Sequence, residues 1–194
     1  ELAGIKSCHS LPMLSVDPHV AETVSGMLPK LTSCERPIAL LCPFTRWPTK
    51  NWPISKFALL AEQLAEEFQV IFTGSTRDRL QIDEVIAGHS PVSAVNLAGR
   101  LSLTEFFALA ARSEVVVTGD SLPMHVASAF DRPLVSLFGP TNELLVGPRN
   151  DTAKILRAAV DCQRCYRRRR CPRACIDKIT VDEVRMAVRS VLEQ

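Results

Sequence analysis

The stretch from residue 115 to residue 141 constrains the fold more than any other part of the chain. It begins with three consecutive valines and passes through a turn at residues 119–121 to Pro123, and proline is favoured at the start of a helix. A second apolar run follows at residues 133–138. The order strand, turn, helix, strand predicts a parallel α/β unit. Ligands of such sheets bind at the carboxyl ends of the strands, against helix N-termini.

The rest of the chain repeats this alternation and contains no internal repeats. Short apolar runs predict further strands, and proline or capping-box patterns before apolar stripes predict helix starts. The predicted strands span residues 38–42, 69–73, 92–97 and 154–158, and the predicted helices begin near residues 17, 53, 75, 102 and 180. The pattern predicts an α/β fold, a Rossmann-like three-layer α/β/α sandwich with a parallel sheet.

The composition agrees with a globular domain. The chain has 194 residues, of which 46% are hydrophobic and 23% charged, so it can bury a core of its own. No apolar run approaches the roughly 18 residues that span a membrane. The first ten residues lack the pattern of a signal peptide, and the first residue is not Met. We therefore expect a processed product or a piece of a longer protein.

The turn before Pro123 is the first candidate anion site. A helix N-terminus offers unpaired backbone N–H groups and a partial positive charge, which favour a phosphate. Ser121 adds a hydroxyl group, and His125 lies about one helical turn further on. The alternative is that Asp120 and Ser121 only cap the helix and that His125 packs in the core.

Two further turns fall on the same predicted edge of the sheet. Lys50 follows the first strand and can bring a mobile positive charge to a diphosphate, although a solvated loop lysine is the alternative. Trp47 and Trp52 in this loop can stack on a base or sugar, or pack beneath the loop. The turn at residues 73–75, with Thr73, Gly74 and later Asp78, can meet a nucleotide, although Ser75 and Asp78 also fit a capping box.

Four of the seven cysteines cluster near the C-terminus, at Cys162, Cys165, Cys171 and Cys175. Four thiolates within so short a segment can close a tetrahedral site around a structural zinc ion. An iron–sulfur centre, two local disulfides or four free thiols are the alternatives. The odd total of cysteines and the lack of a secretory signal indicate a reducing compartment.

The same segment is strongly basic. Six arginines and no acidic residue lie between Cys162 and Ile176, whereas the net charge of the whole chain is only +2. Such a run favours an anionic partner, either nucleic acid or acidic lipid headgroups, and a solvated charge run is the alternative. Nucleic acid is the less expected partner, because the rest of the chain is a complete α/β domain.

Three segments together resemble glycosyltransferase family 9, the ADP-heptose:lipopolysaccharide heptosyltransferases. Residues 120–141, DSLPMHVASAFDRPLVSLFGPT, are similar to the family's signature around the nucleotide-sugar diphosphate. The Lys50-Asn51-Trp52 element and residues 96–105, NLAGRLSLTE, are similar to two others. A cysteine-rich stretch before the last helix also occurs in many members.

The resemblance implies the C-terminal, donor-binding half of a GT-B fold. It divides the chain into an interdomain linker and helix at 1–35, a nucleotide-sugar-binding domain at 36–160, a Cys/Arg-rich loop at 161–177 and a C-terminal helix at 178–194. Lys50, Asp120, Ser121 and His125 would hold the donor diphosphate and sugar, and Thr73, Gly74 and Asp78 would lie near the adenosine.

The implied function is inverting transfer of a sugar from an ADP-heptose-like nucleotide sugar in lipopolysaccharide or related glycan synthesis. The catalytic base, an Asp, and the acceptor site would belong to an N-terminal domain, so this half alone is expected to be inactive. The step would need no metal cofactor. The implied location is the cytoplasm, with peripheral contact to the inner membrane.

Two residues depart from the family pattern. Leu122 and Phe44 stand where the family usually has glycine, and both changes fall at the implied donor site. Glycine lets a backbone approach a phosphate, whereas these residues bring side chains into that space. They favour a different donor sugar or, as an alternative function, a non-catalytic module that binds sugar nucleotides or a partner.

Overall fold

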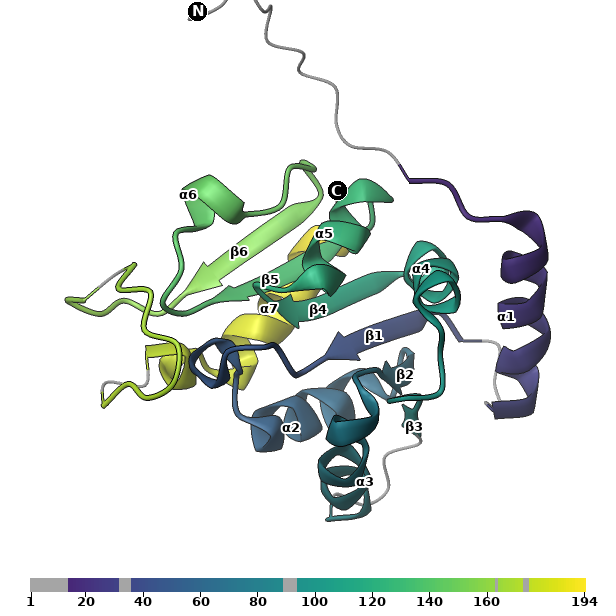
Figure 1. The fold of residues 1–194 in the computed structure, drawn as a ribbon, viewed down its shortest axis with the longest axis horizontal. Helices are drawn as coiled ribbons and strands as arrows, with labels where there is room; N and C mark the ends of the chain where they lie inside the picture. The colour runs from purple at the N-terminus through teal and green to yellow at the C-terminus, as the bar shows by residue number, and fades with distance from the viewer. Residues whose placement is uncertain (1–13, 32–35, 89–93, 163, 173–174) are drawn as a thin grey trace, which may run out of the picture.

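The computed structural model describes residues 14–31, 36–88, 94–162, 164–172 and 175–194 of the chain. Six parallel strands form one sheet in the order β3-β2-β1-β4-β5-β6 (Figure 1). Their bounds are β1 Ile38–Cys42, β2 Gln69–Phe72, β3 Val95–Asn96, β4 Val115–Gly119, β5 Leu134–Phe138 and β6 Ala153–Arg157. This is the strand order of a Rossmann fold, so the predicted fold class is confirmed.

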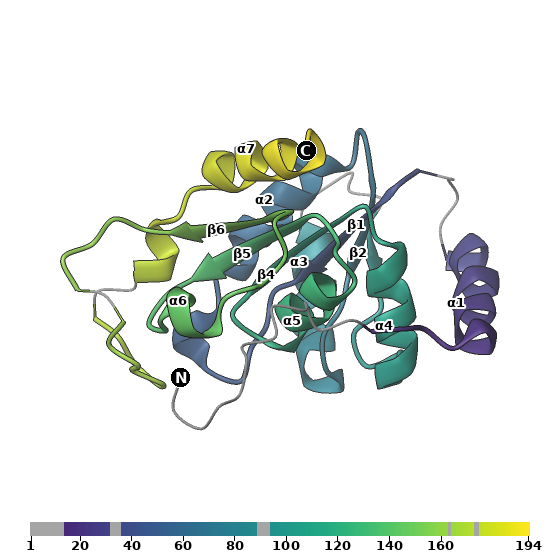
Figure 2. The ribbon, with the colours of Figure 1, turned by 90° about the horizontal axis from the view of Figure 1, so that it is seen from above.

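Helices cover both faces of the sheet, as a three-layer sandwich requires (Figure 2). The α-helices are α1 Pro18–Leu31, α2 Ile54–Leu64, α3 Arg79–Gly88, α4 Leu103–Arg112, α5 Leu122–Ala129, α6 Glu143–Val146 and α7 Val181–Leu192. The described residues also form short 3₁₀ helices, η1 Pro48–Lys50, η2 Thr76–Asp78 and η3 Cys175–Lys178. None of the helices in this described part of the chain is long and apolar enough to cross a lipid bilayer.

The core is divided by the sheet into two apolar layers. Successive side chains of a strand point to opposite faces, so Ala39 and Leu41 pack with α2, α3 and α7, whereas Leu40 and Cys42 pack with α1, α4 and α5. Both faces are buried, which explains why the strands read as continuous apolar runs in the sequence.

Most element starts agree with the predicted signals. Ser102 and Glu105 form a reciprocal capping box at α4, and Thr180 and Glu183 form another at α7. The box that begins at Ser75 opens η2, and α3 continues from it. The short helix α6 was not predicted, because a four-residue helix has too little periodicity to be recognised.

The predicted strand at 92–97 is shorter than expected. Only Val95 and Asn96 pair with β2, and residues 89–93 lie outside the described residues.

The helix α1 packs against α4 rather than standing apart. Val24 and Leu28 are buried with Leu109, and the Arg112 side chain donates a hydrogen bond to the Ser25 hydroxyl over 2.8 Å. Residues 1–13 and 32–35 of the predicted linker lie outside the described residues. The division into linker, domain, loop and last helix therefore stays a prediction.

The strand order reverses its direction between β1 and β4. From this pair the sheet grows outward on one side to β2 and β3 and on the other to β5 and β6, and Cys42 at the end of β1 pairs with Thr118 of β4. The loops that leave the two strands therefore begin side by side. In sheets of this kind, such a crevice is where ligands bind.

Candidate functional site

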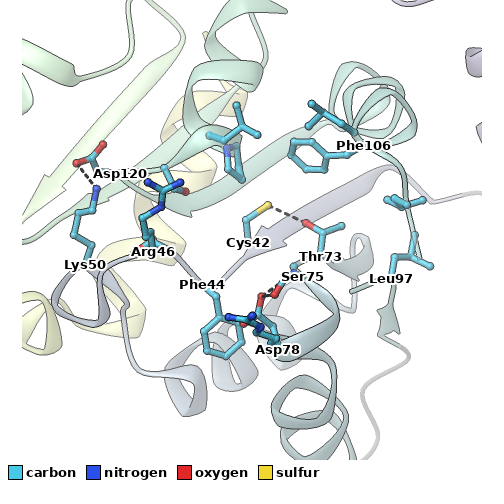
Figure 3. A pocket seen from close by; sticks show the side chains of 18 of the residues that line it. Cys42, Phe44, Arg46, Lys50, Thr73, Ser75, Asp78, Leu97, Phe106 and Asp120 are labelled. Carbon is cyan, nitrogen blue, oxygen red and sulfur yellow. Dashed lines mark hydrogen bonds and ion pairs between the residues drawn. The ribbon is translucent and has the colours of Figure 1, made fainter. Parts of the chain in front are cut away.

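A cavity of about 1020 Å³ opens at this crevice (Figure 3). Four segments line it: the loop after β1 with η1, the turn after β2, the segment from β3 into α4, and the turn from β4 into α5. The lining residues are Cys42, Phe44, Thr45, Arg46, Trp47, Lys50, Thr73, Gly74, Ser75, Arg77, Asp78, Leu97, Leu101, Ser102, Leu103, Phe106, Asp120, Ser121, Leu122 and Pro123. Its size suits a small organic molecule such as a nucleotide.

Lys50 and Asp120 meet at one end of the cavity. The Lys50 ammonium lies 3.0 Å from an oxygen of the Asp120 carboxylate, and both side chains are largely buried, at 13% and 8% exposure. A buried charge without a partner is costly, so each group holds the other in place. The alternative of a solvated loop lysine is therefore wrong, and the cavity has a fixed cation at its wall.

Ser121 caps α5 in an extended backbone conformation. Its hydroxyl oxygen lies 3.2 Å from the Thr118 hydroxyl and 3.3 Å from the Gly119 carbonyl oxygen, and makes no capping bond to the helix. The first N–H groups of a helix have no acceptor within the helix, and α5 begins in the cavity wall with Leu122 and Pro123. An anion in the cavity would therefore meet the positive end of the α5 dipole.

The structure does not place His125, the fourth residue predicted to hold the donor, in the cavity wall with Lys50, Asp120 and Ser121. Its side chain is exposed on α5 and is not part of the cavity wall. The alternative that it packs in the core is also wrong, since the buried neighbours on α5 are Met124 and Val126. Its contact with a diphosphate stays a prediction.

The turn after β2 supplies another part of the wall. Thr73 is buried and its hydroxyl lies 3.1 Å from the Cys42 thiol, whose pKa burial raises to about 12. Asp78 accepts hydrogen bonds from both the backbone N–H and the hydroxyl of Ser75, each over 2.7 Å, as a capping box requires. A Cβ on Gly74 would lie 3.0 Å from the Asp78 carboxylate, so a larger residue here would require the Asp78 side chain to shift.

The sequence did not identify the apolar wall. Leu97 is buried, and Leu101 and Phe106 are half-buried beside it, between the end of β3 and α4 (Figure 3). A flat apolar base could pack on this wall. One feature of the sequence could have revealed this wall: Leu97 comes directly after a strand, at the same edge of the sheet as the other turns. Arg46 was missed as well, although it lies in the loop after β1 and its exposed side chain lines the cavity.

Leu122 and Phe44 both line the cavity. Leu122 is 51% exposed at the first position of α5, and Phe44 is half-buried against the core layer of α2 and α7. The two side chains therefore occupy part of the space that glycine at these positions would leave open.

The two tryptophans have different environments. Trp52 is only 2% exposed, and its indole N–H donates to the Ile179 carbonyl oxygen over 2.9 Å. It packs beneath the loop, edge-on to Phe57. Trp47 lines the cavity, and the Lys50 ammonium lies 4.7 Å from its ring centre.

The four clustered cysteines are free thiols: Cys175 is buried, Cys165 is exposed, and Cys162 and Cys171 are half-buried. Burial raises the pKa of Cys175, and its three neighbours raise it further. Among the described residues, no three His, Cys, Asp or Glu side chains lie close enough together to hold a metal ion.

The zinc site stays a prediction. The zinc content of the purified chain, measured by elemental mass spectrometry, tests it. About one zinc ion per chain, lost on Cys165→Ser, is the result expected for four thiolate ligands.

Comparisons with known proteins show the family of this chain. Residues 6–176 match the model of glycosyltransferase family 9 (heptosyltransferase). The chain is 38% identical over 130 residues to lipopolysaccharide heptosyltransferase 2 of Salmonella typhimurium, covering 64% of this chain and 37% of that protein. It is 38% identical over 153 residues to lipooligosaccharide heptosyltransferase 2 of Haemophilus influenzae, covering 75% of this chain and 44% of that protein.

A solved structure shows the same fold. The Escherichia coli ADP-heptose lipopolysaccharide heptosyltransferase II superposes with a TM-score of 0.80 at 31% identity, over 94% of this chain and 54% of that one. This chain thus spans about half the length of that solved structure. It spans less than half the length of the two curated relatives. The family match covers most of the chain, and the chain therefore belongs to glycosyltransferase family 9, the heptosyltransferases.

Proposed function

We propose that this chain is the donor-binding half of an inverting glycosyltransferase that uses an ADP-heptose-like nucleotide sugar in lipopolysaccharide or related glycan synthesis. The observation that carries the proposal is that Lys50, Ser121 and the start of α5 line one end of the same cavity whose other wall is apolar. A nucleotide sugar needs both features, since its diphosphate is anionic and its base is flat and largely apolar.

Each part of the cavity has a role in this proposal. The base would pack on Leu97, Leu101 and Phe106, with the turn at 73–78 beside the adenosine. The diphosphate would lie between the Lys50 ammonium and the N-terminus of α5. Asp120 would shape this turn and keep Lys50 in place through their 3.0 Å ion pair.

The reaction would be a direct displacement at the sugar. An acceptor hydroxyl attacks the anomeric carbon and gives its proton to the catalytic base proposed for the N-terminal domain. The bond from that carbon to the diphosphate breaks, the nucleoside diphosphate leaves with the bonding electrons, and the configuration inverts. Negative charge develops on the departing diphosphate, where Lys50 and the α5 N-terminus stabilise it more strongly than in the bound donor. These groups meet the charge without a catalytic metal ion.

The donor and pathway are supported by the relatives. The superposed Escherichia coli protein is named for ADP-heptose and lipopolysaccharide, and the curated relatives are named for lipopolysaccharide and lipooligosaccharide. The catalytic base and the acceptor site would belong to an N-terminal domain, and this half alone would be inactive.

The proposed location is the cytoplasm, with peripheral contact to the inner membrane. The exposed arginines at 167–170 would contact the acidic headgroups.

Calorimetric titration tests the proposal. We expect ADP and ADP-sugars to bind this chain, and UDP, the control with a smaller base and the same diphosphate, to bind more weakly. No heat with ADP or any ADP-sugar at millimolar concentration would contradict the donor site. Sugar transfer should be absent with this chain alone and should appear only when the N-terminal half is supplied.

A second candidate is a module that binds sugar nucleotides without catalysis. The side chains of Leu122 and Phe44 in the cavity wall favour it, because they reduce the room at the expected diphosphate and sugar. Binding of ADP but of no ADP-sugar, with no transfer in the presence of the N-terminal half, would support this candidate over the enzyme.

A further inference from the structure

The described residues 164–172 of the Cys/Arg-rich loop lie against the η1 turn that carries Lys50. The Thr49 hydroxyl donates a hydrogen bond to the Arg167 carbonyl oxygen over 2.5 Å. One residue earlier, the backbone N–H of Tyr166 donates to the Pro140 carbonyl oxygen over 3.0 Å. The loop is therefore attached to η1 and to the end of β5 at the same point, more than a hundred positions along the chain from Lys50.

The loop is also fixed where it leaves the domain. The Arg164 guanidinium lies 2.6 Å from one oxygen of the Glu143 carboxylate, and Arg157 of β6 lies 2.8 Å from the other. Arg157 donates as well to the Gly139 carbonyl oxygen over 2.6 Å. These contacts give the loop a defined position relative to the carboxyl edge of the sheet.

Trp47 connects the loop to Lys50. The centre of its ring lies 4.7 Å from the Lys50 ammonium and 4.6 Å from the guanidinium carbon of Arg168. Both distances are within the range of a cation–π interaction. The indole ring thus has one cation in the cavity wall as its neighbour and another on the loop.

The opposite side of η1 rests on the sheet. A Cβ on Gly119 would lie 2.8 Å from the Lys50 carbonyl oxygen, so the turn packs directly on the backbone that precedes Asp120. The η1 turn has no buried residue of its own. The backbone at Gly119 and Gly139, the ion pair of Lys50 with Asp120 and the contact with the loop together set its position.

We infer that Arg168 is a positioning residue for Lys50: through the Trp47 ring, the Cys/Arg-rich loop holds the Lys50 ammonium where the donor diphosphate binds. This inference rests on the proposed function, because it assigns the diphosphate to Lys50. Arg168 acts on the ligand only through Trp47, and it makes the loop part of the donor site although the loop does not line the cavity.

The test is the affinity of the chain for ADP and AMP, measured by calorimetry. Arg168→Gln removes the cation and should weaken ADP binding about two- to fivefold, the size of one partly exposed cation–π contact. AMP has one phosphate fewer and should be affected less, so the preference for ADP over AMP falls. Arg168→Lys keeps the cation and should restore most of the affinity, which a merely structural role of the arginine would not predict.

Arg170→Gln is the matched control. It removes the same charge from the same exposed loop, two positions away, and should leave both affinities within experimental error. The effect of Arg168→Gln should also disappear in a Trp47→Leu background, since the ring is the link. Thermal unfolding of each variant confirms that it is folded.

The outcomes separate the inference from the proposed function. If the unsubstituted chain does not bind ADP, the proposed function is wrong and the inference falls with it. If the unsubstituted chain binds ADP but the Arg168→Gln variant binds it with the same affinity as the Arg170→Gln variant, the inference alone is wrong. If Arg168→Gln weakens ADP binding equally in the Trp47→Leu background, the inference is also overturned, because Arg168 would then act on the ligand without the Trp47 ring.

Discussion

The Lys50 ammonium and the Asp120 carboxylate form an ion pair over 3.0 Å, although the two residues lie 70 positions apart in the chain. Lys50 follows β1 and Asp120 comes directly after β4, and these strands are neighbours at the place where the strand order reverses. The pair therefore joins the two loops that face the cavity. A bound diphosphate would share Lys50 with Asp120.

Replacing Lys50 should separate binding from folding. Lys50→Gln removes the cation from the cavity and should weaken ADP binding about tenfold or more, since hydrogen bonds to charged groups contribute about 1.5 to 3 kcal/mol. It also leaves Asp120 buried without a partner, so the free energy of unfolding should fall by about 1 to 3 kcal/mol. Calorimetry and urea denaturation measure the two effects.

Lys154→Gln is the control for Lys50. Lys154 is exposed on β6 and its ammonium donates a hydrogen bond to the Ser190 hydroxyl over 3.2 Å, so the loss of this ammonium should change neither quantity appreciably. In the double variant Lys50→Gln/Asp120→Asn, the stability loss should be smaller than the sum of the two single losses, as expected for residues in contact. Strict additivity would show that the ion pair contributes nothing.

Shortening Leu122 should change the selectivity of the cavity. Leu122→Ala removes a side chain that is 51% exposed in the cavity wall, so little core packing is lost. We expect ADP-sugars to gain affinity severalfold relative to ADP, because the sugar needs the space that the isobutyl group occupies. Calorimetric titration with both ligands measures the ratio, and an unchanged ratio would show that Leu122 does not limit the sugar site.

The acid stability of the chain should depend on Glu143. Its hydrogen bonds, above all the one from Arg164, lower the pKa of its carboxyl group from 4.5 to about 2. The ionised carboxylate therefore stabilises the fold fully above pH 4.5, and this stabilisation is lost as the pH falls toward 2. Because the ion pair of Glu143 with Arg164 is partly open to solvent, we expect it to contribute about 1 to 2 kcal/mol to the free energy of unfolding.

Chemical denaturation at several pH values between 7 and 2 measures this contribution. Glu143→Gln should be less stable than the unsubstituted chain at pH 7, and the difference should shrink below pH 4.5. Glu66→Gln, a change at an exposed residue of the turn after α2, should parallel the unsubstituted chain throughout. A constant difference between the Glu143→Gln variant and the unsubstituted chain would mean that Glu143 does not titrate as described.

Trp52 should matter for folding and not for ligand binding. Its ring is buried outside the cavity, so Trp52→Ala should cost about 3 to 5 kcal/mol of unfolding free energy. Trp52→Phe should cost much less, because the Ile179 carbonyl oxygen keeps its hydrogen bond from Lys56, over 2.9 Å. Urea denaturation measures both, and a Trp52→Phe variant that stays stable but loses ADP would assign the ring to the ligand site instead.

Local signals predicted most of the fold. Capping boxes at Ser102 and Thr180 mark helix starts through bonds to residues only three positions away, and they were found where the structure has them. The valine run of β4 was also found where it was predicted, and all of its residues are buried. Since parallel strands share one carboxyl edge, the sequence also predicted that Lys50, Thr73 and Ser121 lie at the same edge of the sheet.

The tertiary structure alone decided how these residues meet. The ion pair of Lys50 with Asp120 depends on the strand order, and the exposed position of His125 depends on the rotation of α5. The apolar wall requires α4 to pack beside the end of β3, and the contact of Trp47 with Arg168 requires the Cys/Arg-rich loop to fold back onto η1. Hydrophobic periodicity and capping act over a few residues, whereas these contacts join segments far apart in the chain. The sequence by itself therefore determined most of the elements and the edge of the sheet at which their turns meet, and the packing of the elements determined which side chains line the cavity.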